Sequence, residues 1–502
     1  MRKLAALLLT LALVLGLAST AFAAKPKTLE IYWIANASKE DAETWTPIKE
    51  GVEAAINEYI EPLINANVSF HLVNWDDWGT DALQPLLDGE KIDLIFTADW
   101  RDYVQEINAG ALLPLEDLLE KFGEGITSSL SADFLDGVKY GPFIYGIPTN
   151  KELCVPSGIL VNKTAAAEIG WDVDAYKETG ITTEELEPYL AAYKELYPDN
   201  YPYLMEKGRW SDEPWIHEWI SLPEDVLDMK YAKDENGEFD ETVYSIYEEK
   251  EQEDHIRLMY KWAQLGYIDP EAATYEYNKI FGSGNFLVFT QPLKGNDIKA
   301  VEMAEANGAE FECTEIVMQP KYKVTCQAGG SMFAIPNAAK HKDQAMQYLN
   351  LMHSDPILVN LMLFGKEGVN YTKVNDRQVE LNKDANWYGL HGGAWTVGNT
   401  SLQYVLTTED PDKNELLQKY ADDAPKTASY GFRFDKSKAT KLIEDVEKVA
   451  NEFARPLMVG AVDPDDPEKG LEAFRKALKD AGIDDLKTEV ERQYKEWKDS
   501  MK

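Results

Sequence analysis

This sequence of 502 residues has few basic residues and little cysteine. Lysine and arginine number 50 against 88 aspartates and glutamates, which gives a formal net charge of −38 at pH 7. Nucleic-acid binding depends on clustered lysine and arginine that neutralise phosphate, so this balance argues against a nucleic-acid partner. An anionic membrane surface is disfavoured for the same reason, whereas neutral or cationic ligands are compatible with the charge.

Internal repeats, low-complexity linkers and membrane-length apolar runs are also missing downstream of the N-terminal segment. The remaining composition is typical of a folded protein, because 44% of the residues are apolar and 13 tryptophans and 26 tyrosines supply large core side chains. At roughly 150 residues per domain, the length predicts several folding units rather than one small module.

The first 23 residues have the pattern of a secretory signal peptide. Arg2 and Lys3 precede an apolar run over 4–17, and Ala21-Phe22-Ala23 provides small residues for cleavage after Ala23. An uncleaved membrane anchor is the alternative, but it needs ~20 apolar residues, and this run breaks at Ser19. We therefore expect an exported protein that is extracellular, at the cell surface or in a periplasm.

Only three cysteines are present, so at most one disulfide can form. The first is Cys154, so the lipobox cysteine that anchors many exported binding proteins is missing. Cys313 and Cys326 flank two short predicted strands, 311–318 and 321–326, and can face each other across a hairpin. In an oxidising compartment they can form a disulfide, and two buried thiols are the equally favoured alternative.

Short apolar strands alternate with helical stretches in the N-terminal part of the chain. Strands are predicted over 29–34, 68–73 and 92–97, with helices between them over 40–59 and 82–87. This alternation predicts an α/β fold with a mostly parallel sheet, in which ligands bind at the carboxyl ends of the strands.

Three extended segments, 141–150, 286–292 and 331–336, are predicted to be hinge strands that cross between two lobes. They divide the mature chain into a first lobe of residues 24–147 plus 292–335 and a second lobe of residues 148–291 plus 336–502. The pattern becomes mainly helical after residue 340. A helical C-terminal extension is therefore predicted, with amphipathic helices over 439–453, 471–481 and 484–497.

Tryptophan beside asparagine or aspartate recurs where each of the first three predicted strands ends. The three runs are Trp33–Asn36, Asn74–Trp78 and Thr97–Trp100. Any single tryptophan at such a place is more often part of the core, but the repetition across one sheet favours a binding role for the set. Flat rings match the apolar face of a pyranose, and neighbouring carboxylates and amides match its hydroxyls.

The chain resembles the family 1 extracellular solute-binding proteins of ABC importers, the group that contains maltodextrin-binding protein. The runs that carry this resemblance are Asp93–Thr97, Gly110–Leu115 and Gly330–Ala339. The C-terminal third is similar to a subgroup of these proteins from Gram-positive bacteria. The matching runs there are Phe364–Tyr371, Trp395–Asn399, Gly431–Asp435 and Gly460–Pro464.

The resemblance implies a type II periplasmic-binding-protein-like fold, with two α/β lobes that close on a ligand and deliver it to a membrane permease. It also implies a carbohydrate ligand, most often an oligosaccharide, and we expect a monomer without metal, cofactor or catalytic residues. Its binding regions correspond here to Asn36, Asp76, Trp78, Asp99 and Trp100 after the first three strands, to Asn150, Lys151 and Glu152 at a crossing, to Gln291, and to Trp395.

A carbohydrate-active enzyme is the main alternative to a binding protein. A glycoside hydrolase needs two carboxylates about 5–10 Å apart, but 88 acidic residues make such pairs frequent by chance. The sequence contains no serine nucleophile elbow, zinc-binding histidine pair or phosphate-binding glycine loop. We therefore expect a binding protein, with a secreted enzyme or a binder of peptides or polyamines as alternatives.

Overall fold

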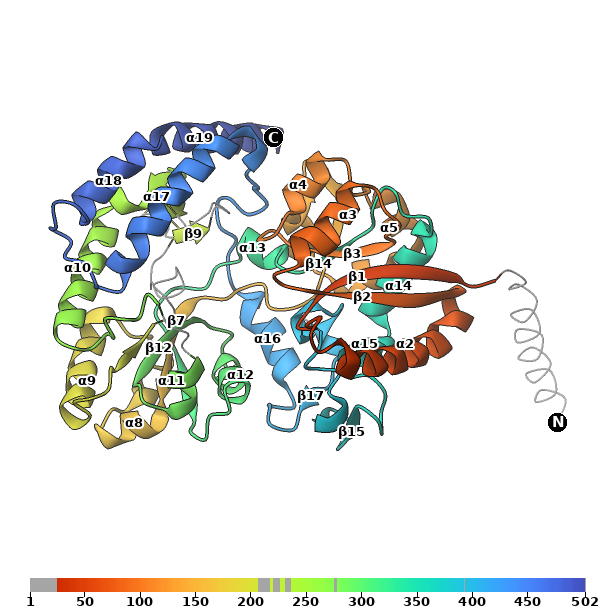
Figure 1. Ribbon diagram of the computed structural model, residues 1–502, viewed down its shortest axis with the longest axis horizontal. Helices are drawn as coiled ribbons and strands as arrows, with labels where there is room; N and C mark the ends of the chain where they lie inside the picture. The colour runs from red at the N-terminus through yellow and green to blue at the C-terminus, as the bar shows by residue number, and fades with distance from the viewer. Residues whose placement is uncertain are drawn as a thin grey trace.

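The computed structural model shows two bodies side by side, joined by several stretches of chain (Figure 1). It describes residues 25–205, 217–219, 226–230, 236–274, 278–391 and 393–501. The predicted signal peptide, residues 1–23, lies outside the described residues. Within the described ranges, no helix is both long enough and apolar enough to span a bilayer.

The first lobe is built on a five-stranded sheet with the order β2-β1-β3-β14-β6. Strand β1 (Lys27–Ala35) pairs in parallel with β2 (Ala66–Asn74) and with β3 (Leu94–Thr97). Strand β14 (Met332–Ala334) pairs antiparallel with β3 and with β6 (Gly146–Pro148). The three parallel strands confirm the predicted alternation, and their carboxyl ends lie along one edge of the sheet.

Helix α2 (Ala42–Ile64) packs one apolar face on this sheet. Its buried side chains, Val52, Ile56, Ile60 and Ile64, recur every four residues and so lie on one side of the helix. The other elements between β2 and β6 are short: the π-helical turn η1 (Gly79–Leu83), α3 (Gln84–Leu87), α4 (Tyr103–Asn108), α5 (Glu116–Phe122), α6 (Glu124–Ser129), α7 (Ala132–Gly137), β4 (Lys139–Tyr140) and β5 (Phe143–Ile144).

The second lobe contains a four-stranded sheet with the order β13-β7-β12-β8. The fully buried strand β7 (Ser157–Asn162) pairs antiparallel with β12 (Val288–Pro292) and β13 (Cys313–Val317). Strand β8 (Tyr203–Leu204) is parallel to β12. The helices of this lobe are α8 (Lys163–Glu168), α9 (Thr183–Leu196), α10 (Lys250–Gln264), α11 (Asn278–Ser283) and α12 (Ile298–Ala306).

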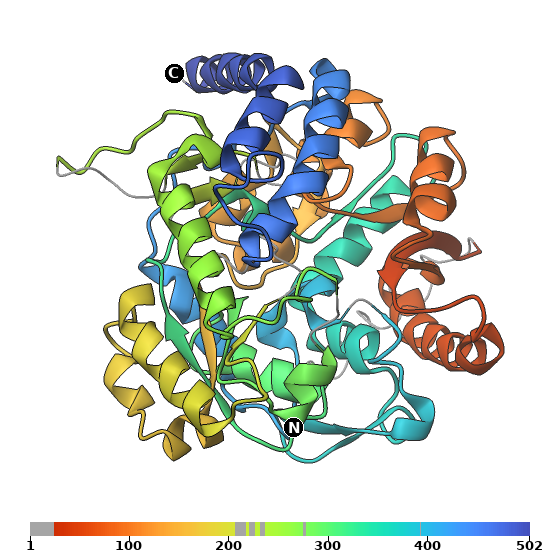
Figure 2. The same ribbon diagram turned by 60° about the vertical axis from the view of Figure 1, so that its left-hand side comes forward.

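Three long helices end the chain and confirm the predicted helical extension: α17 (Thr440–Met458), α18 (Leu471–Asp480) and α19 (Ile483–Ser500). Figure 2 shows them lying beside α10. Their buried side chains share a core with α10, β10 (Leu227–Lys230) and the segment after β11 (Tyr244–Ser245), and β9 (His217–Trp219) completes this small sheet. The extension is therefore part of the body of the second lobe.

The prediction that residues 292–335 belong to the first lobe is wrong for the part up to β13. Strand β12 runs antiparallel to β7, so the chain stays in the second-lobe sheet instead of crossing at Pro292. Leu293 and Met303 are buried in one core with Phe286. The crossing comes after β13, so the hinge predicted over 286–292 is misplaced.

The predicted boundary at residue 336 also differs from the observed packing. Helices α14 (Lys342–Ser354) and α15 (Pro356–Phe364) bury their side chains in the same core as β1. The small sheet of β15 (Tyr371–Lys373), β16 (Gln378–Leu381) and β17 (Val405–Leu406) adds to this core. Residues 342–406 therefore belong to the first lobe, because the nearly uniformly apolar α15 packs against α2.

In the described part of the chain, residues 149–156, 318–331 and 425–433 pass between the two lobes. The last of these follows helix α16 (Lys413–Asp422) and leads into the C-terminal helices. The predicted hairpin around Gln319-Pro320 does not form, because Cys326 lies in the short helix α13 (Thr325–Ala328). Cys313 is a free thiol, so no disulfide joins it to Cys326.

Candidate ligand-binding cleft

Three half-buried tryptophans, which we call the tryptophan cluster, lie together at the carboxyl ends of the first-lobe strands. Trp75 follows β2, Trp100 follows β3, and Trp395 comes from the short turn η7 (Ala394–Thr396). The ring centroid of Trp75 lies 5.8 Å from that of Trp100 and 6.2 Å from that of Trp395, with interplanar angles of 26° and 29°. The cluster confirms that the strand ends place tryptophans next to one another.

Polar contacts fix the orientation of these rings. The indole Nε1 of Trp75 donates to Asn36 Oδ1 at 2.9 Å, and that of Trp100 donates to the carbonyl oxygen of Gly330 at 2.7 Å. The guanidinium of Arg101 lies 5.9 Å from the ring centroid of Trp75 and 5.3 Å from that of Trp100. Its Nη2 donates to the carbonyl oxygen of Trp75 at 3.0 Å, which joins the two strand-end loops.

Arg101 keeps one unused donor, because its buried Nε has no acceptor among the described residues. Burial lowers the pKa of Arg101, whereas the nearby carboxylates of Asp102 and Asp76 oppose that change. A guanidinium stays charged under such conditions, so the cluster has a fixed cation at its edge. The sequence prediction omitted Arg101, although it directly follows Trp100.

Trp78 is not available to a ligand, contrary to the prediction. Its side chain is 1% exposed and packs edge-on against Phe96 at 5.9 Å. The chain turns into the π-helical turn η1 at this residue, which folds Trp78 back onto the sheet. The motif after β2 therefore contributes Trp75 to the tryptophan cluster instead, while Asp76 in the same loop is exposed.

Asp99 forms an ion pair inside the protein and also lines the cavity described below, and its role as a ligand contact stays a prediction. Arg433 donates from Nε to Asp99 Oδ1 at 2.5 Å and from Nη2 to Oδ2 at 2.8 Å, and both side chains are 4% exposed. Arg433 also donates to the carbonyl oxygens of Gly137 at 2.6 Å and Lys139 at 3.0 Å. This ion pair anchors the crossing segment 425–433 to the first lobe.

Asn150 has a structural position in the first crossing segment. Its Nδ2 donates to the carbonyl oxygen of Ser129 at 3.1 Å and to Asn399 Oδ1 at 3.0 Å. Its backbone carbonyl accepts from the Thr400 hydroxyl at 2.7 Å. Both amide hydrogens of the side chain are therefore used within the protein, and a ligand contact by Asn150 stays a prediction.

The neighbouring residues Lys151 and Glu152 are buried and paired with each other. Lys151 Nζ lies 3.4 Å from Glu152 Oε1 and 3.4 Å from Gln327 Oε1, and Lys294 Nζ lies 3.9 Å from Glu152 Oε1. Burial alone would raise the pKa of Glu152, but the Lys151 and Lys294 ammonium groups bring it below its ordinary value. Gln291, at the end of β12, is also buried, and its Nε2 has no acceptor among the described residues.

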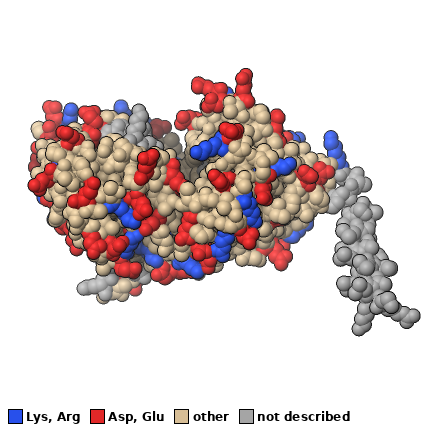
Figure 3. Space-filling view, turned by 90° about the horizontal axis from the view of Figure 1, so that it is seen from below, with Lys and Arg blue, Asp and Glu red and all other residues tan. Residues whose placement is uncertain are grey.

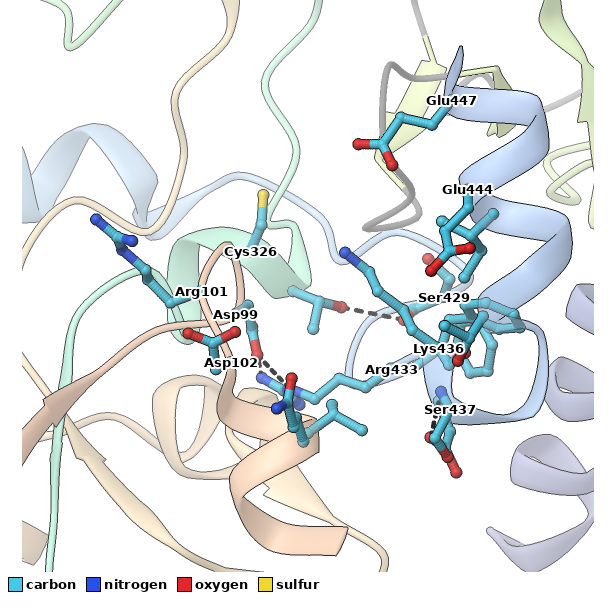
Figure 4. Close-up of a pocket in the computed structure, with 18 residues that line it drawn as sticks. Asp99, Arg101, Asp102, Cys326, Ser429, Arg433, Lys436, Ser437, Glu444 and Glu447 are labelled. Atoms are coloured by element: carbon cyan, nitrogen blue, oxygen red, sulfur yellow. Dashed lines mark hydrogen bonds and ion pairs between the residues drawn. The ribbon is translucent and has the colours of Figure 1, made fainter. Parts of the chain in front are cut away.

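A cavity of about 620 Å³ lies beside the tryptophan cluster, between the two lobes. Figure 3 shows the surface hollowed between the two bodies, with acidic side chains spread over both. Figure 4 shows Arg101 and Asp102 on one side of the cavity and Lys436, Glu444 and Glu447 on the other. Its lining comes from Asp99, Arg101, Asp102, Val104 and Gln105 after β3, from Thr325 and Cys326 in α13, and from eleven residues between Ser429 and Glu447. The tryptophan cluster adjoins this lining through Arg101.

A buried carboxyl group lies beneath the end of β3. Glu106 Oε2 accepts from the Thr97 hydroxyl at 2.7 Å, while Oε1 has no donor among the described residues. Burial raises the pKa of Glu106 to about 8. The group is therefore largely protonated at neutral pH and adds no charge beneath the cluster. Among the described residues, no group of three or more histidine, cysteine or acidic side chains is placed to hold a metal ion.

The chain is similar to known proteins over most of its length. It is 25% identical over 455 residues to a carbohydrate ABC transporter substrate-binding protein of Streptococcus pneumoniae, covering 88% of this chain and 87% of the relative. The crystal structure of the N-glycan transport solute binding protein NgtS from the same species matches with a TM-score of 0.78 and 22% identity, covering 95% of this chain and 100% of that one. The NgtS complex with Man5GlcNAc matches with a TM-score of 0.69 and 22% identity, over 95% and 99% of the two chains.

Two family models match different parts of the sequence. Residues 428–499, which contain the three C-terminal helices, match a domain of unknown function, DUF3502. Residues 80–365, well over half of the chain, match the model of bacterial extracellular solute-binding proteins. The two-lobed α/β fold agrees with this match and confirms the predicted fold class. The chain therefore belongs to the family of bacterial extracellular solute-binding proteins.

Proposed function

We propose that this protein binds an oligosaccharide in the cleft between its lobes and delivers it to the permease of an ABC transporter. The tryptophan cluster beside a cavity of about 620 Å³ is the observation that carries this proposal. Indole rings supply contact area for the apolar faces of sugar rings, and the charged groups of the cavity supply hydrogen bonds for hydroxyls. The cavity combines apolar surface with the charged groups of Arg101, Asp102 and Lys436, a mixture that suits a sugar.

The relatives support the same proposal. One is named as a carbohydrate ABC transporter substrate-binding protein, and the solved structure of NgtS is a complex with the oligosaccharide Man5GlcNAc. NgtS shares the fold of this chain over 95% of its length, which supports a cleft at the corresponding edge of the sheet for a similar ligand class.

Individual side chains have distinct roles in this proposal. Trp75, Trp100 and Trp395 stack against sugar rings, and Arg101 donates to a hydroxyl or ring oxygen from its unused Nε. The exposed Asp76 accepts from a hydroxyl at the rim of the cleft. The unpaired amide of Gln291 supports a contact from the second lobe once the lobes close.

A panel of neutral oligosaccharides tests the binding function directly. Fragments of mannan, xylan, starch and galactan, together with Man5GlcNAc, are titrated calorimetrically into the mature protein. We expect at least one of them to bind, with micromolar affinity corresponding to about −8 kcal/mol. A blue shift of tryptophan fluorescence should accompany binding, since the indoles leave water. If no sugar of the panel binds and a peptide or polyamine binds instead, the carbohydrate assignment is wrong.

The same incubation separates a binding protein from a hydrolase. We propose that the protein has no enzymatic activity, so the bound sugar should be recovered unchanged after prolonged incubation. Chromatography of the recovered sugar detects any shorter product. Cleavage at a rate that depends on protein concentration would favour the secreted carbohydrate-active enzyme.

Export and oligomeric state complete the proposal. We propose that cleavage after Ala23 gives a mature, monomeric protein held outside the cytoplasm without a lipobox cysteine. Intact-mass spectrometry of the protein recovered from its native host should show a chain that begins at Ala24. Light scattering of that material should give the mass of one chain.

A further inference from the structure

The C-terminal helices have an unassigned role, because residues 428–499 match a domain of unknown function. Helix α17 is amphipathic, and Ile443, Val446 and Ala450 on one face are buried in the second-lobe core. Thr440, Glu444 and Glu447 are spaced by four and three residues, so they share a second face of the helix, which borders the buried face at Ile443. All three line the cavity between the lobes.

The segment that leads into α17 is held at the mouth of the cavity from the opposite lobe. Arg433 binds Asp99 at the end of β3, and the Tyr430 hydroxyl donates to the carbonyl oxygen of Asp133 at 2.6 Å. Because Asp99 directly precedes Trp100, this anchor fixes the start of the C-terminal helices close to the tryptophan cluster. These contacts with the first lobe therefore hold α17 in its position beside the cavity.

The carboxylates that line this part of the cavity differ in how they are used. Asp99 is paired with Arg433, and Asp435 accepts from the backbone and hydroxyl of Ser437. Glu444 and Glu447, in contrast, accept no hydrogen bond and form no ion pair among the described residues. Figure 4 shows both side chains extending from α17 on the side of the cavity that faces Arg101.

We propose that the first turns of α17 form the second-lobe wall of the sugar site, with Glu444 and Glu447 accepting hydrogen bonds from sugar hydroxyls. This inference rests on the proposed carbohydrate function and assigns a role to the domain of unknown function. A carboxylate has two acceptor oxygens and no donor, so it pairs well with a hydroxyl-rich ligand. Two carboxylates also repel a ligand that carries carboxylates of its own, so the wall selects neutral sugars over oligouronates.

Substitution of the two carboxylates tests this wall. The double variant Glu444→Gln/Glu447→Gln keeps the size of the side chains and removes both charges. With the neutral oligosaccharide panel we expect binding to weaken by about tenfold or more, because hydrogen bonds to charged groups are the stronger ones. The preference for neutral oligosaccharides over alginate-derived oligouronates should shrink by a similar factor. Glu452→Gln, an exposed residue of α17 outside the cavity lining, is the matched control and should change neither quantity.

A measurement on the unmodified protein makes the test independent of any variant. Hydrogen–deuterium exchange with and without the panel sugar that binds best should show protection of residues 440–447, while α18 is unchanged. The inference would be overturned if the wild type binds a sugar and the double variant binds it with the same affinity and selectivity. The proposed function would then remain intact. Absence of binding to the whole panel would instead remove the proposed function, and the inference with it.

Discussion

The two walls of the cleft use different chemistry. On the first-lobe side, the rings of Trp75, Trp100 and Trp395 lie together beside the lining residue Arg101, and the indole nitrogens of Trp75 and Trp100 already donate within the protein. On the second-lobe side, α17 presents carboxylates without partners among the described residues. A wall of fixed rings supplies area that suits any sugar ring, whereas a wall of unpaired acceptors distinguishes one ligand from another. We infer that affinity comes mainly from the first wall and selectivity mainly from the second.

The ion pair between Asp99 and Arg433 joins the two walls, so breaking it should have the largest effect. Arg433→Met leaves a buried carboxylate without its partner, which costs about 3–5 kcal/mol of unfolding free energy. Denaturant unfolding of the variant and the wild type measures this loss. The double variant Asp99→Leu/Arg433→Met should recover part of the stability, since no buried charge is left. A loss below about 1 kcal/mol for Arg433→Met would contradict the role of an anchor.

Glu106 lies beneath the first wall only, and it should make stability depend on pH. Because its pKa rises from 4.5 to about 8 in the folded protein, folded Glu106 keeps a proton that the unfolded chain releases between these values. Its contribution is therefore complete below pH 4.5 and is lost as the pH rises through 8, at up to about 1.4 kcal/mol per pH unit.

Glu106→Gln removes this dependence. We expect the unfolding free energy of the wild type, relative to the variant, to fall by several kcal/mol between pH 5 and pH 8. Urea unfolding at the two pH values measures the change, with Glu120→Gln, an exposed residue of α5, as the control. A relative stability that rises with pH would show that the buried carboxyl is ionised.

Trp100→Ala isolates the contribution of a ring in the first wall. We expect affinity for the bound oligosaccharide to fall by more than about 1 kcal/mol, with little loss of stability, because the ring is only half-buried and is proposed to stack on a sugar ring. Calorimetric titration and thermal unfolding give the two quantities. Trp78→Ala is the contrasting control, since it should cost about 3–5 kcal/mol of stability and leave the affinity of the folded protein unchanged. If Trp100→Ala behaves like Trp78→Ala, the cluster is only core packing.

The sequence predicted the first wall better than the second. Alternating strands and helices placed the carboxyl ends of β1, β2 and β3 at one edge, and this placement led to Asn36 and Trp100, whereas Trp395 came from the family resemblance. It named Trp78 instead of Trp75, because the choice between them depends on where the chain turns into η1. Local sequence patterns identify the loop that carries a site, whereas the direction of a side chain within that loop depends on tertiary packing.

Long-range relations explain the remaining errors. The ion pair of Asp99 was not predicted because its partner, Arg433, lies 334 residues further along the chain. The lobe boundaries failed because β12 returns antiparallel into its own sheet and because α15 packs on α2, far away in sequence. Neither the antiparallel return of β12 nor the packing of α15 on α2 can be recognised from the neighbouring sequence. The helical extension itself was predicted correctly, but its contribution to the cavity became visible only from the lining residues.

The central claim is that one oligosaccharide contacts both walls of the cleft at once. A crystal structure of the protein with the neutral oligosaccharide that binds most tightly in the panel tests this claim most directly. The account predicts a sugar ring stacked on the tryptophan cluster and a hydroxyl within hydrogen-bond distance of Glu444 or Glu447. A sugar held away from the cluster, or one that touches the cluster while α17 makes no contact, would contradict it.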